Sequence, residues 1–178
     1  WNACGLRIGA LITDNETFHR QAIAEHTVSL CSSVIGQYIF GAVAHEDHAT
    51  LKAWYAKQRG YYQEMLFDFT ARMKSALPGV VVSSPDAALY SVIDVKNLVD
   101  ENFSALDFVM WCASKGAVDV EGKAMTVLTA PMAGFYSVPA GEPNPGRTQM
   151  RVAYVATPER MALVPEIYAR LLKKYLAS

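Results

Sequence analysis

The feature that most constrains the fold is one long amphipathic segment, residues 46–77 of the 178-residue chain. Its apolar positions are Leu51, Trp54, Tyr55, Tyr62, Met65, Leu66, Phe69, Met73 and Leu77. They recur at three- and four-residue intervals with charged residues between them, which predicts a single α-helix. A helix of about 30 residues is about 45 Å long, more than one small domain buries. We therefore expect it to link two layers or two domains, and Pro78-Gly79 to end it.

Composition places the chain among globular proteins. It is 52% hydrophobic, and 16 Lys and Arg against 17 Asp and Glu give a net charge of -1. Disordered chains carry fewer apolar residues and more net charge. The near-zero charge gives no electrostatic reason to expect a nucleic acid or an anionic membrane as partner. No apolar run approaches the roughly 18 residues that a spanning helix needs, so we expect no membrane partner.

The cysteines and histidines do not indicate a metal site. Cys4, Cys31 and Cys112 are odd in number and show no Cys-x-x-Cys spacing. A disulfide framework or a zinc site is therefore not expected, and a reducing, cytoplasmic location is. Residues 45–48 read His-Glu-Asp-His, a metal-like cluster whose spacing better suits a solvated helix start, with its acidic residues near the positive end of the helix dipole.

Shorter apolar segments precede the long helix. Residues 6–13 form a nearly continuous apolar run, typical of a strand buried on both faces. A helical pattern starts at Glu16. Residues 30–43 are apolar over a length that favours a buried helix over a strand, and they include Ser and Gly.

After the long helix, strand and helix patterns alternate. Strands are expected at 80–82, 87–95, 118–120, 125–128 and 150–155, helices at 103–115 and 158–175, and a loop rich in Gly and Pro at 131–147. Asn102 or Ser104 would cap the first of these helices, and Thr157 the second, with Pro158 at its first position. Residues 79–178 are therefore expected to form an α+β domain, with helices packed on a small sheet.

Two arginines lie next to or inside apolar strands. Arg7 stands between Gly5 and Gly9, and Arg151 opens the segment Arg-Val-Ala-Tyr-Val. Because a buried unpaired charge is costly, each guanidinium needs an anionic partner. One alternative is a structural ion pair with Asp or Glu. The other is a clamp that grips phosphate or carboxylate through two parallel bonds. Spacing alone leaves both alternatives open.

The segment around Arg7 resembles the signature that follows the cofactor lysine in class I and II aminotransferases, which depend on pyridoxal phosphate. In that pattern a Lys precedes an Arg by eight positions, with a small residue two before the Arg and a Gly or Ala two after it. Gly5, Arg7 and Gly9 fit. The lysine would fall two residues before Trp1. We therefore expect a fragment of a longer enzyme, inactive by itself.

Three later segments agree with the same family in order. Residues 87–95 begin with two small residues and place an aromatic residue at the start of a strand. Residues 132–136 hold a glycine followed by aromatic residues. Arg151 lies in a strand that precedes a helix opened by Thr157-Pro158-Glu159. The resemblance covers essentially the whole chain.

The resemblance implies an α/β protein of fold type I in three parts. Residues 1–45 would be the end of the large, cofactor-binding domain, and residues 46–78 a long interdomain helix. Residues 79–178 would form a C-terminal α+β small domain, a small mixed sheet flanked by helices. The full-length protein would be a homodimer.

The same resemblance implies an activity and two site residues. Arg7 would hold the phosphate of pyridoxal 5'-phosphate and Arg151 the α-carboxylate of the substrate, with no catalytic residue inside this chain. The enzyme would move an amino group between an amino acid and a 2-oxo acid. Residues 25–33 offer no arginine that could read a second carboxylate, so a preference for aspartate or glutamate is not expected. Two alternatives stay open: a lyase of the same fold with the same cofactor, and an aminotransferase-like ligand-sensing domain of a transcription regulator.

Overall fold

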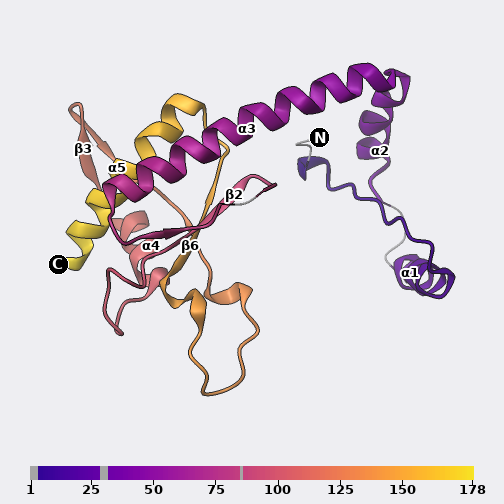
Figure 1. Cartoon of the computed structure of the whole chain (residues 1–178). Helices are drawn as coiled ribbons and strands as arrows, with labels where there is room; N and C mark the ends of the chain where they lie inside the picture. Colours follow the sequence, from indigo (N-terminus) through magenta and orange to yellow (C-terminus); the bar gives the residue numbers. More distant parts are fainter. Residues whose placement is uncertain (1–3, 29–31, 85) are drawn as a thin grey trace. The chain divides into compact units, whose positions relative to one another are not determined.

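The computed structural model describes residues 4–28, 32–84 and 86–178 (Figure 1). It divides into two compact units, Trp1–Gln58 and Arg59–Ser178. The predicted long helix is confirmed as α3, His48–Ala76. The boundary between the two units falls within this helix. The domain boundaries expected after residues 45 and 78 stay predictions. No helix among the described residues is long and apolar enough to cross a membrane.

The unit Trp1–Gln58 buries little of its surface. Its elements are η1 (Cys4–Leu6), α1 (Glu16–Val28), α2 (Val34–Gly41), η2 (Ala42–His45) and the first part of α3. The helix expected from Glu16 is confirmed as α1, and Asn15 Oδ1 accepts a hydrogen bond from the Phe18 N–H at 2.9 Å. Among the described residues of this unit only Gly36 is buried. The unit therefore has no hydrophobic core of its own in the part described.

Two expectations for this unit are wrong. Residues 6–13 form no strand, and Ile12 is 93% exposed. A strand needs a neighbouring strand for its backbone hydrogen bonds, and the described residues of this unit include none. The helix expected at 30–43 exists as α2 and η2, although residues 30 and 31 lie outside the described part. It is not buried, since Tyr38 is 85% exposed. Most side chains of these apolar segments are exposed in the described part of the unit.

The unit Arg59–Ser178 is built on a four-stranded sheet in the order β1-β2-β6-β5. Its strands are β1 (Val81–Val82), β2 (Tyr90–Asp94), β5 (Ala130–Pro131) and β6 (Gln149–Ala153). Strands β2 and β6 pair over five residues, with Tyr90 opposite Ala153 and Asp94 opposite Gln149. They lie side by side in Figure 1, and the loop that precedes β6 extends away from α3. The strand expected at 87–95 starts later, because Ala88 has a φ of 76°.

The expected mixed sheet is wrong, because every pairing among the described strands is antiparallel. A helix between two strands often makes a parallel crossover, and α4 (Ala105–Ser114) follows β2 in this way. Here a separate hairpin, β3 (Val118–Val120) and β4 (Lys123–Met125), comes between α4 and β5. Strands β5 and β6 then join the sheet antiparallel to their neighbours.

A tight turn explains why the strand expected at 125–128 occurs earlier, as β4. Val120 pairs with Lys123, which leaves a two-residue loop. Both loop residues have positive φ, 52° at Glu121 and 78° at Gly122, as in the type I′ turns that suit hairpins. Asp119 Oδ1 accepts a hydrogen bond from the Gly122 N–H at 3.2 Å. The turn fixes the register and ends β4 at Met125.

One face of the sheet carries the core of this unit. Along β6, Met150 and Val152 are buried, and the alternation of a strand sends Gln149 and Arg151 to the other face. Buried side chains of α3, α4 and α5 (Pro158–Leu176) belong to the same hydrophobic cluster. The Phe69 ring of α3 meets the Tyr154 ring edge-on, with centroids 5.3 Å apart. The helices therefore cover one face and leave the other for a site.

The N-cap of α4 supplies a stability prediction. Ser104 Oγ accepts a hydrogen bond from the Asp107 N–H at 3.2 Å, so Ser104 rather than Asn102 is the cap. We expect Ser104→Ala to lower the free energy of unfolding by about 1 kcal/mol, measured by urea titration. Asn102→Ala is the matched control and should change it by less than about 0.5 kcal/mol. Equal losses from both substitutions would contradict the assignment.

Candidate functional site

Arg151 lies at the centre of the sheet face that the helices leave uncovered. This face carries Tyr90 of β2 with Gln149 and Arg151 of β6, and we call it the open face. Within the sheet Arg151 is opposite Val92 on one side and Ala130 on the other. Its side chain is half-buried. Because Val92 and Ala130 are shorter than Arg151, larger side chains from other segments can contact the Arg151 side chain.

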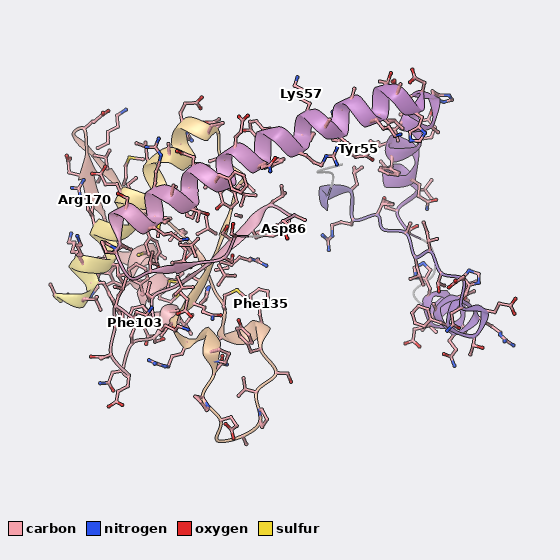
Figure 2. All side chains as sticks on the ribbon, viewed as in Figure 1. Tyr55, Lys57, Asp86, Phe103, Phe135 and Arg170 are labelled. Atoms are coloured by element: carbon pink, nitrogen blue, oxygen red, sulfur yellow. The ribbon has the colours of Figure 1, made fainter. Side chains whose placement is uncertain are left out.

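Two aromatic rings contact the Arg151 guanidinium. Its Cζ atom lies 4.6 Å from the centroid of the Tyr90 ring and 4.8 Å from that of the Phe135 ring. Tyr90 belongs to β2, whereas Phe135 ends η3 (Ala133–Phe135), which follows β5. Figure 2 shows Phe135 between the sheet and the loop that follows it. Each cation–π contact is worth about 0.5–1 kcal/mol at an exposed site, and the two together restrict the guanidinium.

The nearby acidic group, Asp94, is already occupied. Asp94 is 7% exposed, and its carboxylate accepts hydrogen bonds from Thr148 Oγ1 at 2.7 Å, Gln149 Nε2 at 3.1 Å and the Lys96 N–H at 3.0 Å. Within the described residues no carboxylate forms an ion pair with Arg151. The structural ion-pair alternative thus has no support at this position. A guanidinium placed in this way can bind a carboxylate or a phosphate through two parallel hydrogen bonds.

Other reactive groups contribute little to this site. Cys112 is buried in α4, and burial raises the pKa of its thiol to about 11, so the thiol stays protonated near neutral pH. The side chains of Cys4 and Cys31 lie outside the described part. No group of three or more His, Cys, Asp or Glu side chains among the described residues could hold a metal ion. The chemistry of the open face therefore centres on the guanidinium.

Arg7 lies in the other unit, directly after η1. Its φ of 54° is in the left-handed region, which residues other than glycine rarely adopt and which is enriched at binding sites. The Arg7 side chain is exposed. A Cβ atom at Gly5 or Gly9 would meet no atom of the described residues within 4 Å, whereas the Leu6 carbonyl oxygen and the Ile8 side chain lie close to Gly36 of α2. Asn2 and Ala3 of the same motif lie outside the described residues.

Comparison with known proteins identifies the family. The family model described as aminotransferase class I and II matches residues 1–162. The chain belongs to the class I and II aminotransferases. Membership of this family implies pyridoxal phosphate as the cofactor. No match was found among curated proteins.

Solved structures similar to this aminotransferase chain share its fold. LysN, an α-aminoadipate aminotransferase from Thermus thermophilus complexed with N-(5'-phosphopyridoxyl)-L-leucine, has a TM-score of 0.72 and 17% identity, over 97% of this chain and 39% of LysN. A kynurenine aminotransferase from Pyrococcus horikoshii has a TM-score of 0.68 and 18% identity, over 98% and 38%. The valine-pyruvate aminotransferase AvtA from Salmonella typhimurium has a TM-score of 0.67 and 16% identity, over 94% of this chain and 40% of AvtA.

This chain therefore spans about two fifths of the length of these structures. Because the matching family model is that of aminotransferases, neither the lyase nor the regulator alternative is favoured. Sequence reasoning selected Arg7 and Arg151, which the structure places in separate units. It assigned no role to Tyr90 or Phe135. The alternation along β6, together with the aromatic residue that opens β2, was a signal that could have found Tyr90.

Proposed function

We propose that this chain supplies the carboxylate-binding part of an aminotransferase that moves an amino group between an amino acid and a 2-oxo acid. The observation that carries the proposal is the Arg151 guanidinium, which contacts two aromatic rings and has no anionic partner among the described residues. Amino acids and 2-oxo acids share a carboxylate next to the reacting carbon. One guanidinium therefore serves both substrates.

The geometry of the open face suits this role. A guanidinium binds a carboxylate through two parallel N–H donors in one plane, a geometry that Lys cannot reproduce. Tyr90 and Phe135 contact the guanidinium and restrict its orientation, so a bound carboxylate is restricted as well. Holding the carboxylate in one plane orients the adjacent carbon for reaction, and in well-aligned intramolecular systems proximity and orientation together contribute about 7–11 kcal/mol.

We further propose that Arg7 binds the cofactor phosphate. An exposed guanidinium suits a tetrahedral anion, whose oxygens accept hydrogen bonds from several N–H donors. Pyridoxal phosphate, when bound, supplies the electron sink for the chemistry at the amino acid's α-carbon. The proposed role of Arg7 is to bind the cofactor phosphate and so to orient the cofactor.

The proposal extends to the assembly. Residues 1–45 would end the large domain, 46–78 would link the domains, and 79–178 would be the small domain of a cytoplasmic homodimer. The exposed apolar side chains of α2, including Ile35 at 74% and Tyr38 at 85%, support an additional covering surface in the full-length protein.

Isotope transfer tests the proposed activity. The full-length enzyme, loaded with pyridoxal phosphate, is given a panel of amino acids carrying labelled nitrogen, with pyruvate, glyoxylate or 2-oxoglutarate as acceptor. We expect the label to appear in the amino acid formed from at least one acceptor, in an amount equal to the 2-oxo acid formed from the donor. Release of the label as ammonia would instead identify a lyase. Absence of transfer from every donor would overturn the proposal.

A further inference from the structure

We propose that Tyr136 is a positioning residue that holds Phe135 against the Arg151 guanidinium, by means of Gln149 and Asp94. The inference rests on the proposed function, because it concerns how the carboxylate site keeps its shape. Phe135 is 58% exposed and lies at the start of a long loop, where a ring without support would turn freely. Its contact with Arg151 therefore needs a cause elsewhere in the structure.

Asp94 fixes the orientation of the Gln149 side-chain amide. A carboxylate only accepts hydrogen bonds, so the Gln149 atom that faces Asp94 must be the nitrogen. Gln149 Nε2 donates to Asp94 Oδ2 at 3.1 Å. Asp94 is itself held by Thr148 Oγ1 at 2.7 Å and is buried. The Gln149 oxygen, Oε1, is therefore left as an acceptor at a fixed place on the open face.

Tyr136 is hydrogen-bonded to the Gln149 side chain. Its hydroxyl donates to Gln149 Oε1 at 2.5 Å, a short hydrogen bond. Tyr136 follows Phe135 directly in the chain and is the C-terminal boundary of η3. Because adjacent residues share a peptide unit, anchoring Tyr136 to β6 anchors the backbone of Phe135 beside Arg151.

The N-terminal end of η3 is held by contacts with residues 144–148. Asn144 Nδ2 donates to the Ala133 carbonyl oxygen at 3.0 Å. A Cβ atom at Gly146 would lie 2.5 Å from the Ala133 nitrogen, so η4 (Pro145–Thr148) packs directly on the η3 backbone. Arg147 Nη1 donates to the Glu101 carbonyl oxygen at 2.7 Å, which ties η4 to the rest of the unit. With both ends of η3 held, Phe135 is preorganised before any carboxylate binds.

The test uses the full-length, cofactor-loaded enzyme and 4-methylpentanoate, a carboxylate with no amino group that competes with amino acid donors. Tyr136→Phe keeps the ring and removes the hydroxyl. We expect its inhibition constant for 4-methylpentanoate and its KM for donors to rise about three- to tenfold, the usual effect of one hydrogen bond, with kcat changed less than about twofold. A general structural defect would lower kcat and the amount of folded protein instead.

Tyr154→Phe is the matched control. It removes a phenol hydroxyl from the same unit on the core face, where Tyr154 donates to Ser91 Oγ at 2.9 Å and burial raises its pKa to about 12. This variant should melt at a lower temperature with an unchanged inhibition constant. A rise in that constant equal to the rise in Tyr136→Phe would overturn the inference.

A double-mutant cycle separates this inference from the proposed function. If Tyr136 acts through Phe135, Tyr136→Phe should have no further effect in a Phe135→Leu background. Equal losses in both backgrounds would overturn the positioning role. Arg151→Ala is measured in parallel. If it abolishes 4-methylpentanoate binding while Tyr136→Phe matches the native protein, only the inference fails. If Arg151→Ala binds the probe normally, the proposed function fails and the inference with it.

Discussion

Replacing Arg151 with alanine is expected to lower kcat/KM of the full-length enzyme by about 100-fold or more for every amino acid donor, which corresponds to about 3 kcal/mol. The lost contact is to the α-carboxylate, which all donors share, so the loss should not depend on the donor's side chain. Steady-state kinetics with donors of different side chains measure the effect.

Arg151→Lys is the informative companion. It keeps the positive charge but loses the planar pair of donors and the stacking on Tyr90 and Phe135, so it should restore only part of the activity. Full recovery would show that charge alone is needed. A loss confined to one donor would make Arg151 a reader of side chains, and no loss at all would remove it from the site.

Replacing Arg7 with alanine is expected to weaken cofactor binding by about 10- to 100-fold. A charge-assisted hydrogen bond to phosphate contributes about 1.5–3 kcal/mol, and alanine offers none. The variant should lose pyridoxal phosphate during dialysis. The absorbance of the cofactor that the protein retains measures this loss. Arg7→Lys should retain more cofactor than Arg7→Ala, because it keeps the charge.

Arg7→Gly separates the charge of this residue from its backbone conformation. The φ of 54° favours glycine, so this variant should be at least as stable to urea as Arg7→Ala. Both variants lack the guanidinium, so both should lose cofactor to the same extent. Native cofactor retention in either variant would contradict the phosphate role. Retention in the glycine variant alone would show that backbone conformation matters and charge does not.

The helices could be predicted because their signals are local. The three- and four-residue spacing of apolar residues in α3 is visible in the sequence. Pro158 begins α5 as expected, and Thr157 occupies the N-cap position, although its side chain makes no capping hydrogen bond. Caps and apolar spacing act within a few turns and need no knowledge of the rest of the fold. The apolar run at 6–13 could not be resolved in the same way. Its strand pattern depends on neighbouring strands, which the described residues of that unit do not provide.

The sheet and the site depend on distant pairings. No local sequence pattern predicts that β6 pairs with both β2 and β5 or that these pairs are antiparallel. Arg151 was found from its apolar surroundings and the family pattern. The contacts with Phe135 and the bond from Tyr136 to Gln149 follow from a loop that folds back onto the sheet. A sequence rich in Gly and Pro predicts a loop but not where its residues come to lie.

The most direct test of the central claim, that Arg151 binds the substrate carboxylate, is a crystal structure of the full-length enzyme with 4-methylpentanoate bound. We expect both carboxylate oxygens to lie about 2.7–2.9 Å from two nitrogens of the Arg151 guanidinium, the geometry of a bidentate pair. The rings of Tyr90 and Phe135 should still contact that guanidinium. A carboxylate bound at another cation, with Arg151 paired to an Asp or Glu of the protein, would contradict the claim.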